Sequence, residues 1–87
     1  MKVLMKPIDM IATHPREGIP IPFKYRISST DGTKKVIKVD KIIHRDEEKL
    51  AGNRMLLYRC QSVINGRERI YELKYEVSTC RWFLFKI

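Results

Sequence analysis

Residues 54–77 read RMLLYRCQSVI-NG-RERIYELKYEV, two runs of strand-forming residues on either side of an Asn-Gly pair. Asn65-Gly66 between such runs is the strongest short-range signal for a β-hairpin with a two-residue type I′ turn. The turn fixes the register, because residues equally far from it must face each other. The expected opposed pairs are Cys60 with Tyr71, Tyr58 with Leu73, and Leu56 with Tyr75.

These pairs are all apolar or amphipathic, so one face of the hairpin is expected to face a core. On the other face Arg59 opposes Glu72, which is a favourable cross-strand charge pair. The turn and the alternation lead independently to the same hairpin, and the sequence therefore predicts an all-β protein.

The segment before this hairpin predicts a first strand over residues 6–13, a turn-rich break over residues 14–18, and then extended backbone. Pro20 and Pro22 push the residue before each of them towards β or polyproline geometry. Proline has no N–H to give to a central ladder, so this part of the second strand is expected at a sheet edge.

A second hairpin is predicted over residues 23–44. Thr30-Asp31-Gly32 supplies a three-residue turn with Gly32 in the left-handed conformation, because a two-residue turn would oppose inward to outward positions. The strand after the turn is expected to run from Lys34 to His44. The inward-facing residues of this hairpin are predicted to be Phe23, Tyr25, Ile27, Ile37, Val39 and Ile43.

Residues 45–53 have a different composition, because they hold the acidic run Asp46-Glu47-Glu48 and stop at Gly52-Asn53. They are predicted to form a loop with at most one helical turn, which Gly52 would cap.

The last strand, residues 81–87, is apolar on both faces. A two-residue turn at Ser78-Thr79 would send Trp82 and Leu84 into the core, and a three-residue loop would send Phe83 and Phe85 there instead. A bent strand in a small barrel could bury both sets. Alternatively, an outer apolar surface would bury a partner or a second copy. Its members would be Met55, Leu57, Ile70, Phe83 and Phe85.

Together these segments predict one all-β domain over residues 1–87, a small antiparallel barrel, closed or partly open, with five to six strands of the SH3-like or OB-like kind. Eighty-seven residues allow one modest core and little room for a deep cleft. Closure would remove exposed sheet edges. The predicted core is Phe23, Tyr25, Ile27, Ile37, Val39, Leu56, Tyr58, Tyr71, Leu73 and Tyr75.

The composition favours a cytoplasmic protein with no membrane partner. No apolar run approaches the length of a membrane span, and residues 1–7 lack the apolar stretch of a signal peptide. Cys60 and Cys80 form no zinc motif, and small secreted domains usually carry more cysteines. Free thiols are expected, while a disulfide between the two remains geometrically open.

No residue pattern indicates an enzyme, a metal site or a cofactor. His14 and His44 have no nucleophile in a recognisable context and no metal-ligand spacing. The acidic run over residues 46–48 is explained more simply by a solvated loop than by a metal site or an acid/base pair.

Charge is the main functional clue. Eighteen Lys and Arg stand against ten Asp and Glu, for a net charge of +8 and a pI near 9.8. A domain pI above about 9 is typical of nucleic-acid-binding proteins. Six basic residues gather on the second predicted hairpin. Lys24, Arg26 and Lys38 are expected on its outward face, Lys34 and Lys35 beside its turn, and Lys41 further along its second strand.

These residues predict non-catalytic binding of single-stranded DNA or RNA by neutralising phosphates, with Trp82 or Phe83 stacking on bases. Alternation in an antiparallel hairpin would also produce a solvated basic face with no ligand. The alternative function is a protein–protein interaction module, or a self-associating homodimer, that uses the apolar C-terminal strand.

Five short sequence segments resemble those of known protein families: KPID (6–9), IKVDKI (37–42), KLAGNR (49–54), YELKYE (71–76) and TCRW (79–82). Over nearly its whole length the chain resembles a family of small uncharacterised proteins of clostridia-type bacteria. More remotely, mainly over residues 71–84, it is similar to a bacterial domain-of-unknown-function family found beside Y-family (translesion) DNA polymerase genes. The acidic run departs from that remote pattern. The resemblance implies a link to DNA transactions and assigns no functional residue.

Overall fold

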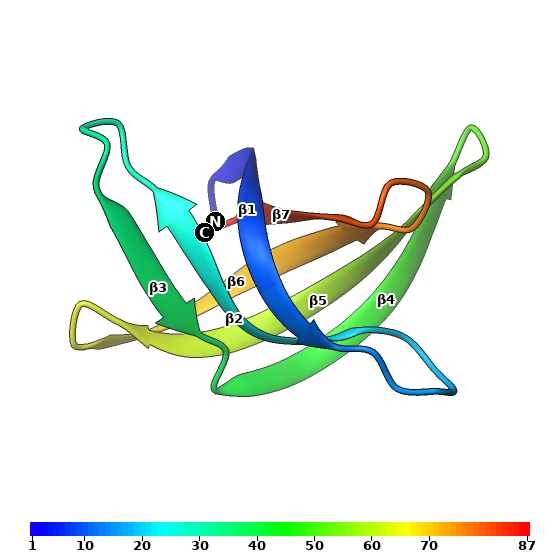
Figure 1. The fold of residues 1–87 in the computed structure, drawn as a ribbon, viewed down its shortest axis with the longest axis horizontal. Coiled ribbons are helices and arrows are strands. Elements are labelled where there is room, and N and C mark those ends of the chain that lie inside the picture. Colours follow the sequence, from blue (N-terminus) through cyan, green and yellow to red (C-terminus); the bar gives the residue numbers. More distant parts are fainter.

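The computed structural model describes all 87 residues, and every regular element in it is a strand. The strands form one antiparallel sheet in the order β3-β2-β1-β7-β6-β5-β4 (Figure 1). Their bounds are β1 (Val3–Thr13), β2 (Ile21–Ser28), β3 (Lys34–Lys38), β4 (Lys41–Leu50), β5 (Asn53–Ile64), β6 (Arg67–Glu76) and β7 (Arg81–Lys86).

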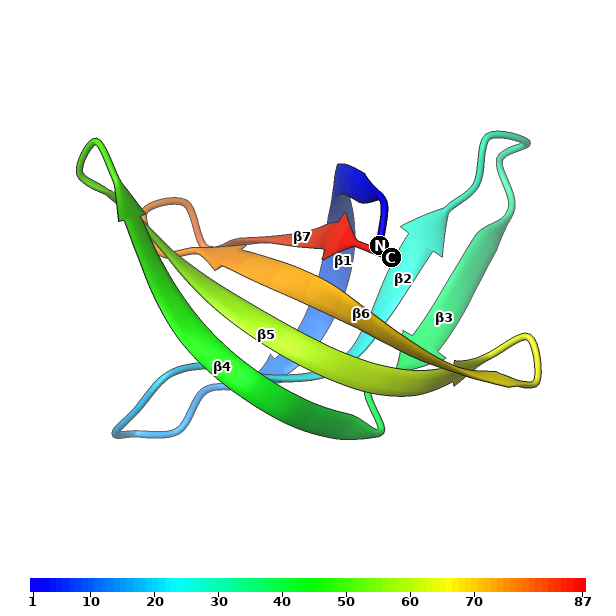
Figure 2. The same cartoon turned by 180° about the vertical axis from the view of Figure 1, so that it is seen from behind.

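The sheet curls into a half-barrel, which Figures 1 and 2 show from opposite sides. The predicted all-β class is therefore confirmed, but the predicted barrel of five to six strands, closed or partly open, is instead a seven-stranded sheet that does not close. The first and last strands pair with each other, with Val3 opposite Lys86. Two backbone hydrogen bonds between Lys2 and Ile87, of 2.7 and 3.0 Å, extend this ladder to the chain ends.

The β5–β6 hairpin has the predicted register along its whole length, from Met55 opposite Glu76 to the pair beside the turn. Asn65 and Gly66 have φ angles of 52° and 74°. A type I′ turn requires positive φ at both central residues, so the predicted turn is confirmed.

The acidic segment was predicted to be a loop, but in the structure it forms the second half of β4. Ala51 and Gly52 have φ angles of 49° and 84°, so they form another two-residue turn that folds β4 onto β5. The prediction failed because Ala-Gly lacks the Asn or Asp that usually signals this turn. An edge strand exposed on both faces also has the polar composition of a loop.

The predicted strand over residues 34–44 is broken at Val39-Asp40, and its two parts lie at opposite edges of the sheet. Val39 donates its N–H to the Phe23 carbonyl on one side (2.8 Å), and Asp40 donates to the Gln61 carbonyl on the other (3.0 Å). Two residues thus join the edges at this corner of the half-barrel (Figure 1).

The core fills the concave face, and eight of the ten predicted core residues are buried there. Ile27 is half-buried, whereas Phe23 is 46% exposed, so its predicted burial is wrong. The cause is a bulge in β2: Ile11 pairs with Lys24 and Ala12 with Pro22, which leaves Phe23 unmatched.

β2 lies between β1 and β3, but its first residues Ile21 and Pro22 pair only with β1, so the part of the strand that contains Pro22 has a strand on one side only, as predicted. A second bulge, between Ile42 and His44, turns Ile43 outward and overturns its predicted burial. Bulges shift inward and outward positions by one residue, and alternation alone does not reveal them.

The last hairpin has the register of the two-residue alternative, with Tyr75 opposite Trp82. Trp82 and Leu84 therefore enter the core. The Trp82 ring lies between two tyrosines, with centroid distances of 5.2 Å to Tyr58 and 4.8 Å to Tyr75.

The core contains tyrosine hydroxyl groups and a cysteine thiol that are buried in their protonated, uncharged form. Tyr71 and Ser62 share a hydrogen bond of 2.6 Å between their hydroxyl groups, and Tyr58 donates to the Pro20 carbonyl. Burial raises the pKa of Cys60 from 9.0 to about 12 and that of Tyr58 from 10.0 to about 12. These groups keep their protons in the folded state at pH values where the unfolded chain releases them.

Stability is therefore expected to fall as the pH rises above about 9. Below that pH both states hold the Cys60 proton, and above it only the folded state does, until the pH approaches 12. Each such proton contributes a slope of about 1.4 kcal/mol per pH unit. Urea unfolding at a series of pH values should show a shallower alkaline decline in Cys60→Ala. Equal slopes in the two proteins would contradict this explanation.

One backbone N–H on the free edge of β4 is already hydrogen-bonded to a side chain of the same strand. Leu50 and Asn53 flank a two-residue turn and therefore form a hydrogen-bonded pair. Every second residue of β4 directs its N–H towards β5, so Glu47, three positions before Leu50, directs its N–H away from β5. The Asp46 carboxylate accepts a hydrogen bond from that N–H, with an N–O distance of 2.8 Å. A donor at the middle of the open edge is thus occupied within the chain, which hinders pairing with another strand.

Asp46→Ala should increase self-association relative to the unmodified protein, because it frees this edge donor. Asp46→Asn is the matched control, since it removes the same charge but keeps an oxygen that can accept the bond. Sedimentation velocity over a range of concentrations measures the effect. The same increase in both variants would assign it to charge and not to the edge.

Candidate nucleic-acid interface

The convex face of β1, β2 and β3 carries two neighbouring rows of side chains that cross the three strands. Tyr25 and Ile37 lie on the concave face, so the residues on either side of them in β2 and β3 point to the convex face. In one row Ile11, Lys24 and Lys38 lie opposite one another, and in the next row Asp9, Arg26 and Val36 do so.

The two rows differ in how their charges are compensated. Arg26 forms an ion pair with Asp9, with an Nη2–Oδ2 distance of 2.8 Å. Lys24 and Lys38 face each other directly, and neither forms an ion pair. Like charges directly opposite on neighbouring strands destabilise a sheet. This row is therefore a site of uncompensated positive charge.

An exposed aromatic ring lies beside these lysines. The bulge that keeps Phe23 out of the core places its ring 5.8 Å from the Lys24 ammonium, measured to the ring centroid. An open hollow of about 420 Å³ lies next to Lys24 and extends to the Asp9–Arg26 row, and its lining includes Ile11 and Val36 but neither Phe23 nor Lys38. A cation, an aromatic ring and a partly apolar hollow thus occur together.

The other predicted basic residues are dispersed. Lys34 is exposed at the start of β3, beside the turn. Lys35 pairs with Ile27 and so belongs to the opposite face of the strand, where its ammonium donates to the Asn65 side chain. Lys41 lies on β4, across the corner from β3. The structure brings together Lys24, Arg26 and Lys38 and places Lys34 on the same face, one row further along β3 and opposite Ser28. Lys35 and Lys41 are separated from them.

The predicted stacking residues do not lie on this face. Trp82 is only 6% exposed, so its ring is not available to a base. Phe83 is half-buried on the convex side of β7, and β1 separates it from β2. The sequence reasoning missed Phe23. The available signal was Pro22, because a proline inside a strand often marks a bulge, and a bulge changes which neighbours face outward.

The predicted outer apolar surface is only partly covered within the chain: Met55 is buried, Leu57, Phe83 and Phe85 are half-buried, and Ile70 is 49% exposed. Met55 and Lys74 are 8% and 7% exposed, and Phe85 is half-buried beside them. The Lys74 ammonium lies 3.8 Å from the centroid of the Phe85 ring and 3.0 Å from Glu48 Oε1. The ammonium therefore has both a carboxylate and an aromatic partner on the convex face.

No group of three or more His, Cys, Asp or Glu side chains could hold a metal ion, and no helix is long and apolar enough to cross a membrane. Both cysteines are free, Cys60 buried and Cys80 exposed. No protein-family model, curated protein or solved structure matches the chain.

Proposed function

We propose that this protein binds single-stranded nucleic acid, DNA or RNA, without catalysis, through the convex face of β1, β2 and β3. The observation that supports this most directly is the opposed pair Lys24 and Lys38, which has no acidic partner. Such a pair opposes folding, and a phosphate between the two ammonium groups would turn the repulsion into attraction.

Each part of the face has a role in this proposal. Lys24 and Lys38 neutralise backbone phosphates, and Phe23 offers its ring to a base. The adjoining hollow receives part of that base or its sugar. Arg26 contributes less, because Asp9 already neutralises its charge.

An exposed ring favours single strands over duplexes. A base in a single strand presents its π-face to an aromatic side chain, and stacking of this kind contributes about 1–3 kcal/mol per base. A duplex would offer only its phosphates to the lysines and leave Phe23 without a partner.

A protein-interaction or self-association surface on β7 is the rival proposal. It is less well supported, because Met55 and Lys74 are already covered within the single chain. A partner would therefore gain little further apolar burial from them.

The Lys24→Glu/Lys38→Glu variant should lose binding to a labelled oligonucleotide of about 12 nucleotides, a length within the usual range for small single-strand-binding barrels. The matched control is Arg16→Glu/Lys49→Glu, which changes the net charge equally at exposed positions outside these three strands. Fluorescence anisotropy at low salt measures both. Equal losses would reduce the effect to net charge, and an unmodified protein that binds nothing would refute the proposal.

Single neutralisations should separate the two rows of the face. Lys24→Gln should lower the slope of log K against log salt concentration by about 0.7, the value for one phosphate contact with a single strand. Arg26→Gln should lower it much less, because Asp9 compensates Arg26. Anisotropy titrations at several salt concentrations give the slopes. A larger change in Arg26→Gln would contradict the assigned roles.

A further inference from the structure

The tip of the β5–β6 hairpin carries a second group of uncompensated cations. Arg67 and Arg69 have the parity of Tyr71 and Leu73, so they belong to the concave side of β6, beyond the end of the core. Both are exposed. Two residues apart on one strand, they are about 7 Å from each other along its direction.

Lys35 joins this group from β3. It is on the inward side of its strand, opposite Ile27, and its ammonium donates a hydrogen bond to the Asn65 side chain at the tip. This contact holds the edge strand against the hairpin. We call Lys35, Arg67 and Arg69 the tip site.

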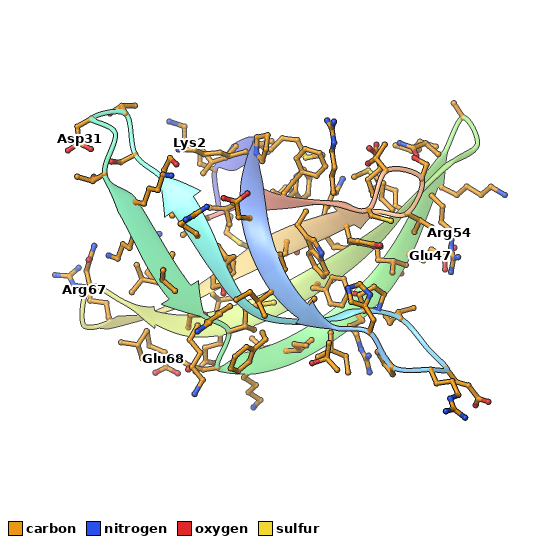
Figure 3. All side chains as sticks on the ribbon, viewed as in Figure 1. Lys2, Asp31, Glu47, Arg54, Arg67 and Glu68 are labelled. Atoms are coloured by element: carbon orange, nitrogen blue, oxygen red, sulfur yellow. The ribbon has the colours of Figure 1, made fainter.

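The acidic side chains closest in the hairpin ladder, Glu68 and Asp40, have other hydrogen-bond partners. Glu68 lies between the two arginines in sequence but has the opposite parity, and its carboxylate accepts a hydrogen bond from Gln61. Figure 3 shows Arg67 and Glu68 on opposite sides of the hairpin tip. None of the three cations of the tip site forms an ion pair.

The free edge of β3 lies between the lysine row and the tip site. β3 is the last strand of the sheet on this side, with Lys38 on its convex face and Lys35 on its concave face. These two lysines are three positions apart, a distance of about 10 Å along the strand. A negatively charged chain that leaves Lys38 reaches the tip site by crossing this edge.

We infer that the bound strand runs from Lys24 and Lys38 over the free edge of β3 to the tip site, an inference that rests on the proposed function. The path turns from one face of the sheet to the other within a few nucleotides. Duplex DNA has a persistence length of about 150 base pairs and does not follow such a turn. The route therefore selects flexible single strands and requires a minimum length.

The test compares thymidine oligonucleotides of 4 to 20 nucleotides on the unmodified protein and on Arg67→Gln/Arg69→Gln. Arg16→Gln/Arg45→Gln is the control, since it removes two exposed arginines elsewhere. The tip variant should bind the shortest strands as the unmodified protein does and long strands at least tenfold more weakly. Its salt slope for long strands should fall by about 1.4, the value for two lost phosphate contacts. Urea unfolding of each variant verifies the fold.

The outcomes separate this inference from the proposed function. If the tip variant binds long strands as tightly as the unmodified protein, the path over the edge is wrong while the lysine row stands. If it loses short and long strands equally, the two-part path is also wrong. If no oligonucleotide binds the unmodified protein, the proposed function itself fails. A duplex of equal length should bind more weakly and be insensitive to the tip substitutions.

Discussion

The parity that the Asn65-Gly66 turn sets on β5 and β6 determines most of the remaining structure. Because both residues adopt positive φ, the strands meet without slippage, and Tyr58, Tyr71 and Tyr75 all point to one side. Trp82 then packs between two of them and brings β7 into the same register. One shifted residue in this hairpin would expose every one of these rings. The concave core is thus a consequence of two turn residues.

The control of strand register by turn residues also explains which parts of the fold could be predicted from the sequence. Where a turn residue of special geometry defines a hairpin, as at Asn65-Gly66 and Gly32, the opposed pairs follow from counting, and both hairpins have the expected registers. Where the ladder contains a bulge, counting fails. Phe23 and Ile43 were both misplaced for this reason, since each bulge is settled by the fit of neighbouring strands. The turn at residues 51–52 was missed because Ala51 gives no local signal for positive φ.

The candidate site follows the same division. Strand alternation predicted that Lys24, Arg26 and Lys38 share a face, and they do. It did not predict that Asp9 neutralises one of the three, because β1 pairs with β2 through long-range packing. Nor did it single out Arg67 and Arg69, whose importance depends on the approach of β3 to the hairpin tip. Whether a charged side chain has an ion-pair partner depends on residues that are close in space but far apart in the sequence, and only the folded structure identifies them.

The pairing of the first strand with the last bears on how this chain folds. From β4 to β7 each strand pairs with the next one in sequence, so this meander closes only short loops. The β1–β7 ladder instead joins residues from opposite ends of the chain and bears the largest loop-closure entropy. Contacts of long sequence separation slow the folding of small domains. The ladder between β1 and β7 is therefore expected to form last, after the meander and after the corner at Val39-Asp40 has joined β3 to β4.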